Sequence, residues 1–210
     1  MEAFVSLLQE QWQQQSMLEV VAVIFSLLYP LLAARQNILC WPCALISTGL
    51  YVHLFWEVSL PFQSLLNGYY LLMAVYGWIK WRKGADEDAL SVTQWPIWYH
   101  VIAIPVLLMT SFAISHLVSF SWLSSDLYLD ALVTVFSVYT TYLMANKILE
   151  NWLFWIVINS FAAYLYFNNS LMLTGVMFIW YVGMAIYGYK VWLNDYRDSE
   201  SALVEQKLST

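Results

Sequence analysis

The stretch from Trp41 to Trp81, WPCALISTGLYVHLFWEVSLPFQSLLNGYYLLMAVYGWIKW, decides the fold, because much of it recurs 111 residues later. The second copy, from Trp152 to Trp192, reads WLFWIVINSFAAYLYFNNSLMLTGVMFIWYVGMAIYGYKVW. A gap-free superposition gives 10 identities in 41 positions, and both copies end in the pattern YGxxxW. Self-similarity at a fixed spacing indicates a fold built from repeats. We therefore expect two copies of one structural unit.

The composition is that of an integral membrane protein. Of the 210 residues, 61% are hydrophobic and only 10% are charged, whereas a soluble domain carries about 25% charged residues. This excludes a water-soluble enzyme, a nucleic-acid-binding protein and a disordered chain.

Seven apolar segments are long enough to cross a membrane as helices, since a crossing needs about 20 residues. They cover residues 17–34, 38–56, 60–79, 95–116, 127–145, 150–167 and 170–193. The repeat then predicts an all-α membrane protein in which two parallel three-helix repeats are joined by a linker helix. We divide the chain into an external N-terminal segment, repeat 1, a loop with the linker helix, repeat 2 and a mobile cytoplasmic tail, at 1–16, 17–83, 84–120, 121–193 and 194–210.

The basic residues set the expected orientation. In a seven-span arrangement all eight fall on one side of the membrane: Arg35, Lys80, Arg82, Lys83, Lys147, Lys190, Arg197 and Lys207. Loops rich in Lys and Arg stay in the cytoplasm. We therefore expect the N-terminus outside and the C-terminus in the cytoplasm.

Parallel repeats related by an axis along the membrane normal are a transporter architecture, with the substrate bound at the repeat interface near mid-membrane. A channel or a receptor is the alternative. No phosphate-binding GxxxxGK[ST] loop is present. The polar faces of the third and sixth segments, described next, carry no carboxylate near mid-membrane that could couple transport to an ion. Facilitated diffusion is the expected mechanism, with no cofactor and no bound metal.

Two helical stripes of polar and aromatic side chains are candidates for the substrate site. At 100° per residue, the third and sixth segments each gather such residues on one face, including Gln63, Asn67, Tyr70, Trp152, Trp155 and Asn159. An aromatic face binds a desolvated flat cation by about 2 kcal/mol, and amides hold hydroxyl or carboxamide groups. Hydrogen bonding between packed helices is the alternative role for both asparagines.

Two motifs resemble those of the PnuC family of bacterial vitamin transporters. The segment Glu150–Asn159, ENWLFWIVIN, is similar to the family's ENWxxW, and Tyr76–Trp81, YGWIKW, is similar to its YGWxxW. The resemblance implies a fold like that of the SWEET sugar transporters and a homotrimer with a pathway in each protomer. It also implies transport of nicotinamide riboside, a precursor for NAD biosynthesis, down its gradient across the bacterial inner membrane, with trapping by a separate cytoplasmic kinase.

By motif position, the resemblance assigns substrate binding to Asn151, Trp152, Trp155 and Asn159. Asn67 falls where relatives often have glutamine. Other branches of the family carry thiamine or riboflavin, so this departure keeps a thiamine transporter as the alternative. The expected partners are the small flat substrate, membrane lipid and further copies of the chain; no nucleic acid is expected.

Two other constellations have weaker functional readings. Cys40 and Cys43 have CxxC spacing and raise a remote alternative, a membrane thiol-redox enzyme, but a thioredoxin-like motif needs a βαβ setting. His53 and Glu57 lie four residues apart, so a helix would pair them on one face.

Overall fold

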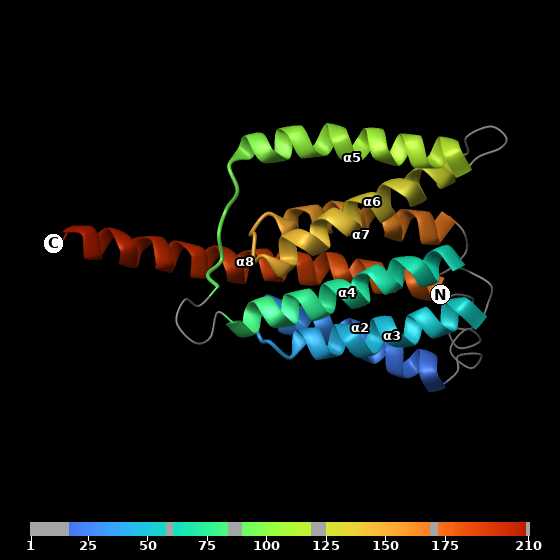
Figure 1. The fold of residues 1–210 in the computed structure, drawn as a ribbon, viewed down its shortest axis with the longest axis horizontal. Helices are drawn as coiled ribbons and strands as arrows, with labels where there is room; N and C mark the ends of the chain where they lie inside the picture. The colour runs from blue at the N-terminus through green and yellow to red at the C-terminus, as the bar shows by residue number, and fades with distance from the viewer. Residues whose placement is uncertain (1–16, 58–60, 84–89, 119–124, 169–171, 209–210) are drawn as a thin grey trace, which may run out of the picture.

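The computed structural model describes residues 17–57, 61–83, 90–118, 125–168 and 172–208. Within these ranges the chain is helical, apart from short connections and one isolated bridge between Thr93 and Ile148. The seven helices are α2 (Met17–Ala34), α3 (Cys40–Glu57), α4 (Pro61–Lys83), α5 (Ile97–Val118), α6 (Ser125–Ala145), α7 (Asn151–Asn168) and α8 (Met172–Leu208) (Figure 1).

The expected segments correspond to these helices in order and position. The structure differs most at the last one, where α8 continues to Leu208, beyond the apolar segment that we expected to end at residue 193. Residues 194–208 are polar but contain good helix formers such as Ala202, Glu205 and Lys207. The apolar segment therefore ends before the helix does.

The helices form two groups of three. In one group α3 contacts α2 and α4, and in the other α7 contacts α6 and α8. The groups meet through two pairs, α2 with α8 and α4 with α6, while α5 contacts only α6 among the described helices. Figure 1 shows α5 along one edge of the bundle. We call the end where α2, α4 and α6 finish and α8 passes the basic end, because Arg35, Lys80, Lys147 and Lys190 lie there.

The spacing of 111 residues extends to the turns at this end. Gln36 after α2 and Lys147 after α6 have φ values of 52° and 53°, in a region that residues other than glycine seldom adopt. The amide of Gln36 donates to Ala33 O, and the amide of Lys147 donates to Met144 O, again one repeat apart. The two turns therefore have the same backbone conformation, although their sequences differ.

Four tryptophans, Trp41, Trp81, Trp152 and Trp192, pack together at the basic end and form what we call the tryptophan cluster. Each is at most 6% exposed. Within each repeat the two rings meet edge to face, with centroids 5.2 Å apart for Trp41–Trp81 and 5.4 Å for Trp152–Trp192. Trp81 and Trp192 join the repeats, with centroids 6.2 Å apart.

Hydrogen bonds from this cluster cross between the repeats. Trp81 Nε1 of repeat 1 donates to Ala145 O at 3.2 Å, and Trp192 Nε1 of repeat 2 donates to Ala33 O at 3.1 Å. The last helix of each repeat is thus tied to the first helix of the other. This reciprocal pattern explains why α2 packs on α8 and α4 on α6.

Gly188 and its counterpart Gly77 allow the close approach of two of these rings. A Cβ at Gly188 would lie 2.6 Å from the Trp152 ring, whereas one at Gly183 on the same helix would meet no atom within 4 Å. We expect Gly188→Ala to lower stability by about 1–3 kcal/mol, because overpacking displaces the ring. Thermal unfolding in detergent measures this, with Gly183→Ala as the matched control; equal melting temperatures for the two variants would contradict the tight packing.

Four of the described helical segments are long and apolar enough by themselves to cross a membrane: Met17–Ala34, Ile97–Leu117, Tyr128–Ala145 and Thr174–Ala202. In α3 the apolar stretch is shorter, Cys40–Leu54. The helices α4 and α7 carry the polar and aromatic stripes, which lowers their mean hydropathy.

Candidate substrate site between the two repeats

Two tyrosine–serine pairs join the repeats near the middle of the helices. Tyr181 Oη on α8 donates to Ser26 Oγ on α2 at 3.1 Å, and the hydroxyls of Tyr70 on α4 and Ser137 on α6 are hydrogen bonded. The tyrosines are 111 residues apart, and so are the serines. Near the middle of the helices, a tyrosine of each repeat is therefore hydrogen bonded to a serine of the other.

Asn159 lies at the same height on the interior face of α7. It is 6% exposed, and within the described residues no hydrogen bond engages its side-chain amide. Trp155, one turn nearer the basic end, is half-buried and packs against the hydrophobic core. The side chains expected to bind substrate on the sixth segment thus face the interior, and a free amide and a ring lie next to each other.

Asn151 and Trp152 lie deeper, at the first turn of α7. Asn151 Nδ2 donates to Ile148 O at 2.6 Å, while Asn151 Oδ1 and Trp152 Nε1 are buried without a hydrogen-bond partner in the described part of the chain. An unpaired buried polar atom costs about 1–3 kcal/mol. Both residues are within the tightly packed basic end, with Trp152 held by Gly188 and Trp192.

The α4 stripe contributes on the other side of the interface. Asn67 and Tyr70 are half-buried, and the latter is held by Ser137 as described above. Gln63 falls on the first turn of α4, but its side chain lies outside the described part of the structure. Since α4 packs on α6 and not on α7, Asn67 and Asn159 are carried by helices that do not contact each other.

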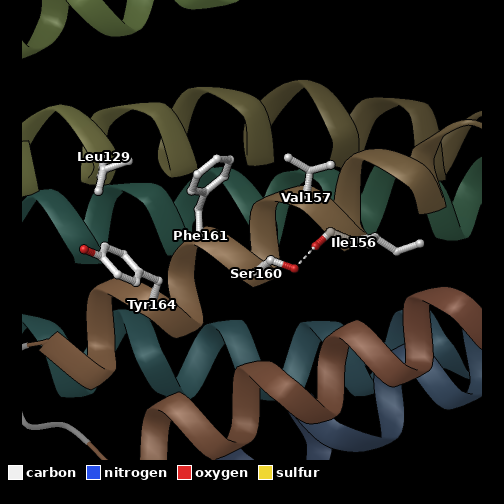
Figure 2. Close-up of a pocket in the computed structure, with 6 residues that line it drawn as sticks. All are labelled: Leu129, Ile156, Val157, Ser160, Phe161 and Tyr164. Carbon is white, nitrogen blue, oxygen red and sulfur yellow. Dashed lines mark hydrogen bonds between the residues drawn. The ribbon is translucent and has the colours of Figure 1, made fainter.

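The hollow drawn in Figure 2 lies on the opposite face of α7 and includes none of the expected substrate residues. It is apolar and open, and it is lined by Leu129, Ile156, Val157, Ser160, Phe161 and Tyr164. Ser160 Oγ donates to Ile156 O of its own helix at 2.7 Å, which satisfies its hydroxyl in an apolar setting. This surface has the character of a lipid-facing groove.

The other two residue pairs singled out from the sequence, His53–Glu57 and Cys40–Cys43, have structural roles in the described part of the chain. His53 Nε2 lies 3.4 Å from Glu57 Oε1, which confirms the expected pair on one helical face. Cys40 and Cys43 are free and buried. No group of three His, Cys, Asp or Glu side chains in the described ranges could hold a metal ion.

Sequence reasoning missed four residues that join the repeats: Ser26, Ser137, Gln36 and Lys147. The serines are identical at the repeat spacing, and extending the comparison upstream of Trp41 would have found them. Gln36 and Lys147 share only their backbone conformation, so no residue identity marks them.

Comparison with known proteins identifies the family. Residues 16–194 match the family described as nicotinamide mononucleotide transporter. The chain is 25% identical to the nicotinamide riboside transporter PnuC of Escherichia coli (strain K12), with 89% of each chain covered. It is also 25% identical to the riboflavin/roseoflavin transporter RibM of Streptomyces davaonensis, with 88% of this chain and 89% of the relative covered.

A solved structure shares the fold. The crystal structure of the vitamin B3 transporter PnuC superposes with a TM-score of 0.70 at 21% identity, and the alignment covers 92% of this chain and 88% of that chain. The family match spans most of the sequence and includes both quoted motifs. The chain therefore belongs to the nicotinamide mononucleotide transporter family, the family of PnuC, and is a multi-pass membrane transporter of the vitamin-transporting type and not an enzyme.

Proposed function

We propose that this transporter carries nicotinamide riboside across the bacterial inner membrane by facilitated diffusion, and that a separate cytoplasmic kinase traps the product inside. The observation that carries the proposal is Asn159, whose interior amide is engaged by no hydrogen bond of the described residues and lies one turn from Trp155. The PnuC relative of similar length supports the choice of substrate.

The chemistry of the site suits this solute. The pyridinium ring would stack on Trp155, worth about 2 kcal/mol when desolvated, and the carboxamide and ribose would pair with Asn159 and Asn67. Asn151, Trp152 and Tyr70 would complete the site, with Gln63 at its outer edge. No Asp or Glu is among the buried side chains of the described residues, so no buried carboxylate opposes release of a cation.

The proposed transport cycle uses the two repeats as moving parts. Residues 17–83 and 121–193 would rock against each other, with 84–120 as the connection, and expose the site alternately to the two sides. The basic end faces the cytoplasm by the charge rule, which places the N-terminus outside. We further propose a homotrimer in which each protomer transports independently.

Riboflavin is the second candidate substrate, because the relative RibM is as similar in sequence as the Escherichia coli PnuC. Thiamine, the alternative raised by Asn67, is also a flat cation, so stacking on Trp155 does not separate it from nicotinamide riboside.

The test is calorimetric titration of the purified, detergent-solubilised protein with nicotinamide riboside, riboflavin and thiamine in separate experiments. We expect heat of binding with nicotinamide riboside only. Binding of riboflavin or thiamine alone would keep the site and reassign its substrate. If none of the three vitamins gives a heat of binding with protein that elutes as a single oligomer, the proposal is overturned.

A further inference from the structure

At the basic end, a residue of one repeat contacts its own counterpart in the other. Lys147 Nζ donates to Gln36 Oε1 at 2.8 Å, and the two positions are one repeat spacing apart with matching φ values. Trp81 and Trp192, also counterparts, have ring centroids 6.2 Å apart. When two units are related by a two-fold axis, equivalent residues can meet only at that axis. Both contacts therefore mark where the axis passes.

In a transporter built from parallel repeats, the axis lies along the membrane normal and the solute is bound between the repeats. A contact on the axis consequently lies across the route of the solute. The Lys147–Gln36 contact and the Trp81–Trp192 contact are both nearer the basic end than Trp155 and Asn159. Both contacts therefore lie between the proposed site and the basic end.

Charged and aromatic partners from both repeats hold Lys147 in this position. Its Nζ lies 4.7 Å from the centroid of the Trp81 ring, and Gln36 Nε2 donates to Asp195 Oδ2 at 2.6 Å. Burial lowers the pKa of Lys147, and the nearby Cys40 and Asp195 groups oppose that shift. Asp195 is on the part of α8 that continues beyond the apolar segment, so this extension braces the contact.

We infer that Lys147 and Gln36, backed by Trp81 and Trp192, form the gate that closes the substrate pathway at the basic end. The inference rests on the proposed transport function. The gate opens when the two repeats separate at the axis and the Lys147–Gln36 hydrogen bond breaks. Because one partner is a lysine and the other a glutamine, the closed contact is a charge-assisted hydrogen bond, which is stronger than a neutral one.

Cys40 provides a native reporter for opening. It is 0% exposed and lies near Lys147 at the basic end. In a Cys43→Ser background, a membrane-impermeant maleimide applied to the basic end in inside-out vesicles reports its exposure. We expect Lys147→Ala to speed labelling about tenfold, because it removes the charge-assisted hydrogen bond and the cation–π contact and so shifts the population toward the open state. Lys190→Ala, an exposed lysine at the same end, is the matched control, and Lys147→Arg should restore slow labelling.

A second experiment holds the gate closed with a reversible cross-link. In a background with Cys40→Ser and Cys43→Ser, the pair Gln36→Cys and Lys147→Cys is joined by a short bifunctional thiol reagent that a reductant can cleave. We expect uptake of labelled nicotinamide riboside to stop on cross-linking and return on reduction, while either single cysteine variant treated in the same way keeps its uptake.

The outcomes separate this inference from the proposed substrate. Labelling that is unchanged in Lys147→Ala, or undiminished uptake through a cross-linked pair, would overturn the gate whatever the substrate is. If the unaltered protein neither binds nor takes up nicotinamide riboside, the proposed substrate fails, yet faster labelling of Cys40 in Lys147→Ala would still support the gate.

Discussion

Replacing Trp155 with alanine is expected to weaken nicotinamide riboside binding by about 30-fold, and replacing Asn159 with alanine by a comparable factor. A flat cation loses about 2 kcal/mol when a desolvated aromatic face is removed, and each 1.4 kcal/mol is a factor of ten in affinity. Loss of the Asn159 amide leaves solute groups unpaired at a cost of about 1–3 kcal/mol. Calorimetric titration of each purified variant measures the change.

Phe161→Ala is the matched control for this experiment. Phe161 is on the same helix, is 41% exposed and lines the apolar hollow on the opposite face (Figure 2). Its removal should leave affinity unchanged. All three variants should elute as the same oligomer as the unaltered protein. Normal binding by both Trp155→Ala and Asn159→Ala would show that the α7 stripe serves helix packing and that the substrate binds elsewhere.

The second large effect is expected from Trp192→Ala, which should destabilise the protein by about 3–5 kcal/mol, as large-to-small changes of buried tryptophan do. Trp192 is 0% exposed, contacts the rings of Trp81 and Trp152, and donates to Ala33 O across the repeat interface. The variant would lose packing within repeat 2 and the bond to repeat 1 together. Thermal unfolding followed by size-exclusion elution measures the loss.

Two companion variants divide this effect into its parts. Trp192→Phe keeps most of the ring volume but loses the indole donor, so about 1 kcal/mol should be lost. Trp180→Ala removes a 44% exposed tryptophan from the same helix and should change the melting temperature little. If Trp180→Ala were as destabilising as Trp192→Ala, the tryptophan cluster would not be the joint between the repeats.

The sequence predicted the helices well because their apolar runs are bounded by polar residues. The repeat placed Trp41 and Gly77 at the same spacing as Trp152 and Gly188, but the packing of each tryptophan ring on its glycine was not predicted. The interior position of Asn159 followed from helical periodicity alone.

Other features were missed for different reasons. The end of α8 at Leu208 follows from helix propensity outside the apolar segment, which a search for apolar runs does not detect. Gln36 and Lys147 have a left-handed backbone that glycine and asparagine adopt more readily, so neither turn was predicted from its residue type. The partners of Trp81 and Trp192 are main-chain carbonyl groups, which every residue has and no sequence pattern marks.

The reciprocal tryptophan bonds also bear on how the protein is made. Trp81 leaves the ribosome long before its acceptor, Ala145, and the carbonyl of Ala33 waits for Trp192, 159 residues later. In a nascent chain that ends after α4, the Trp81 indole therefore has no acceptor, and the surface of α2 that α8 covers in the finished protein is exposed. Assembly must hold the first three helices in the bilayer unfinished until the second three arrive, and a fragment released early would be a natural target for membrane quality control.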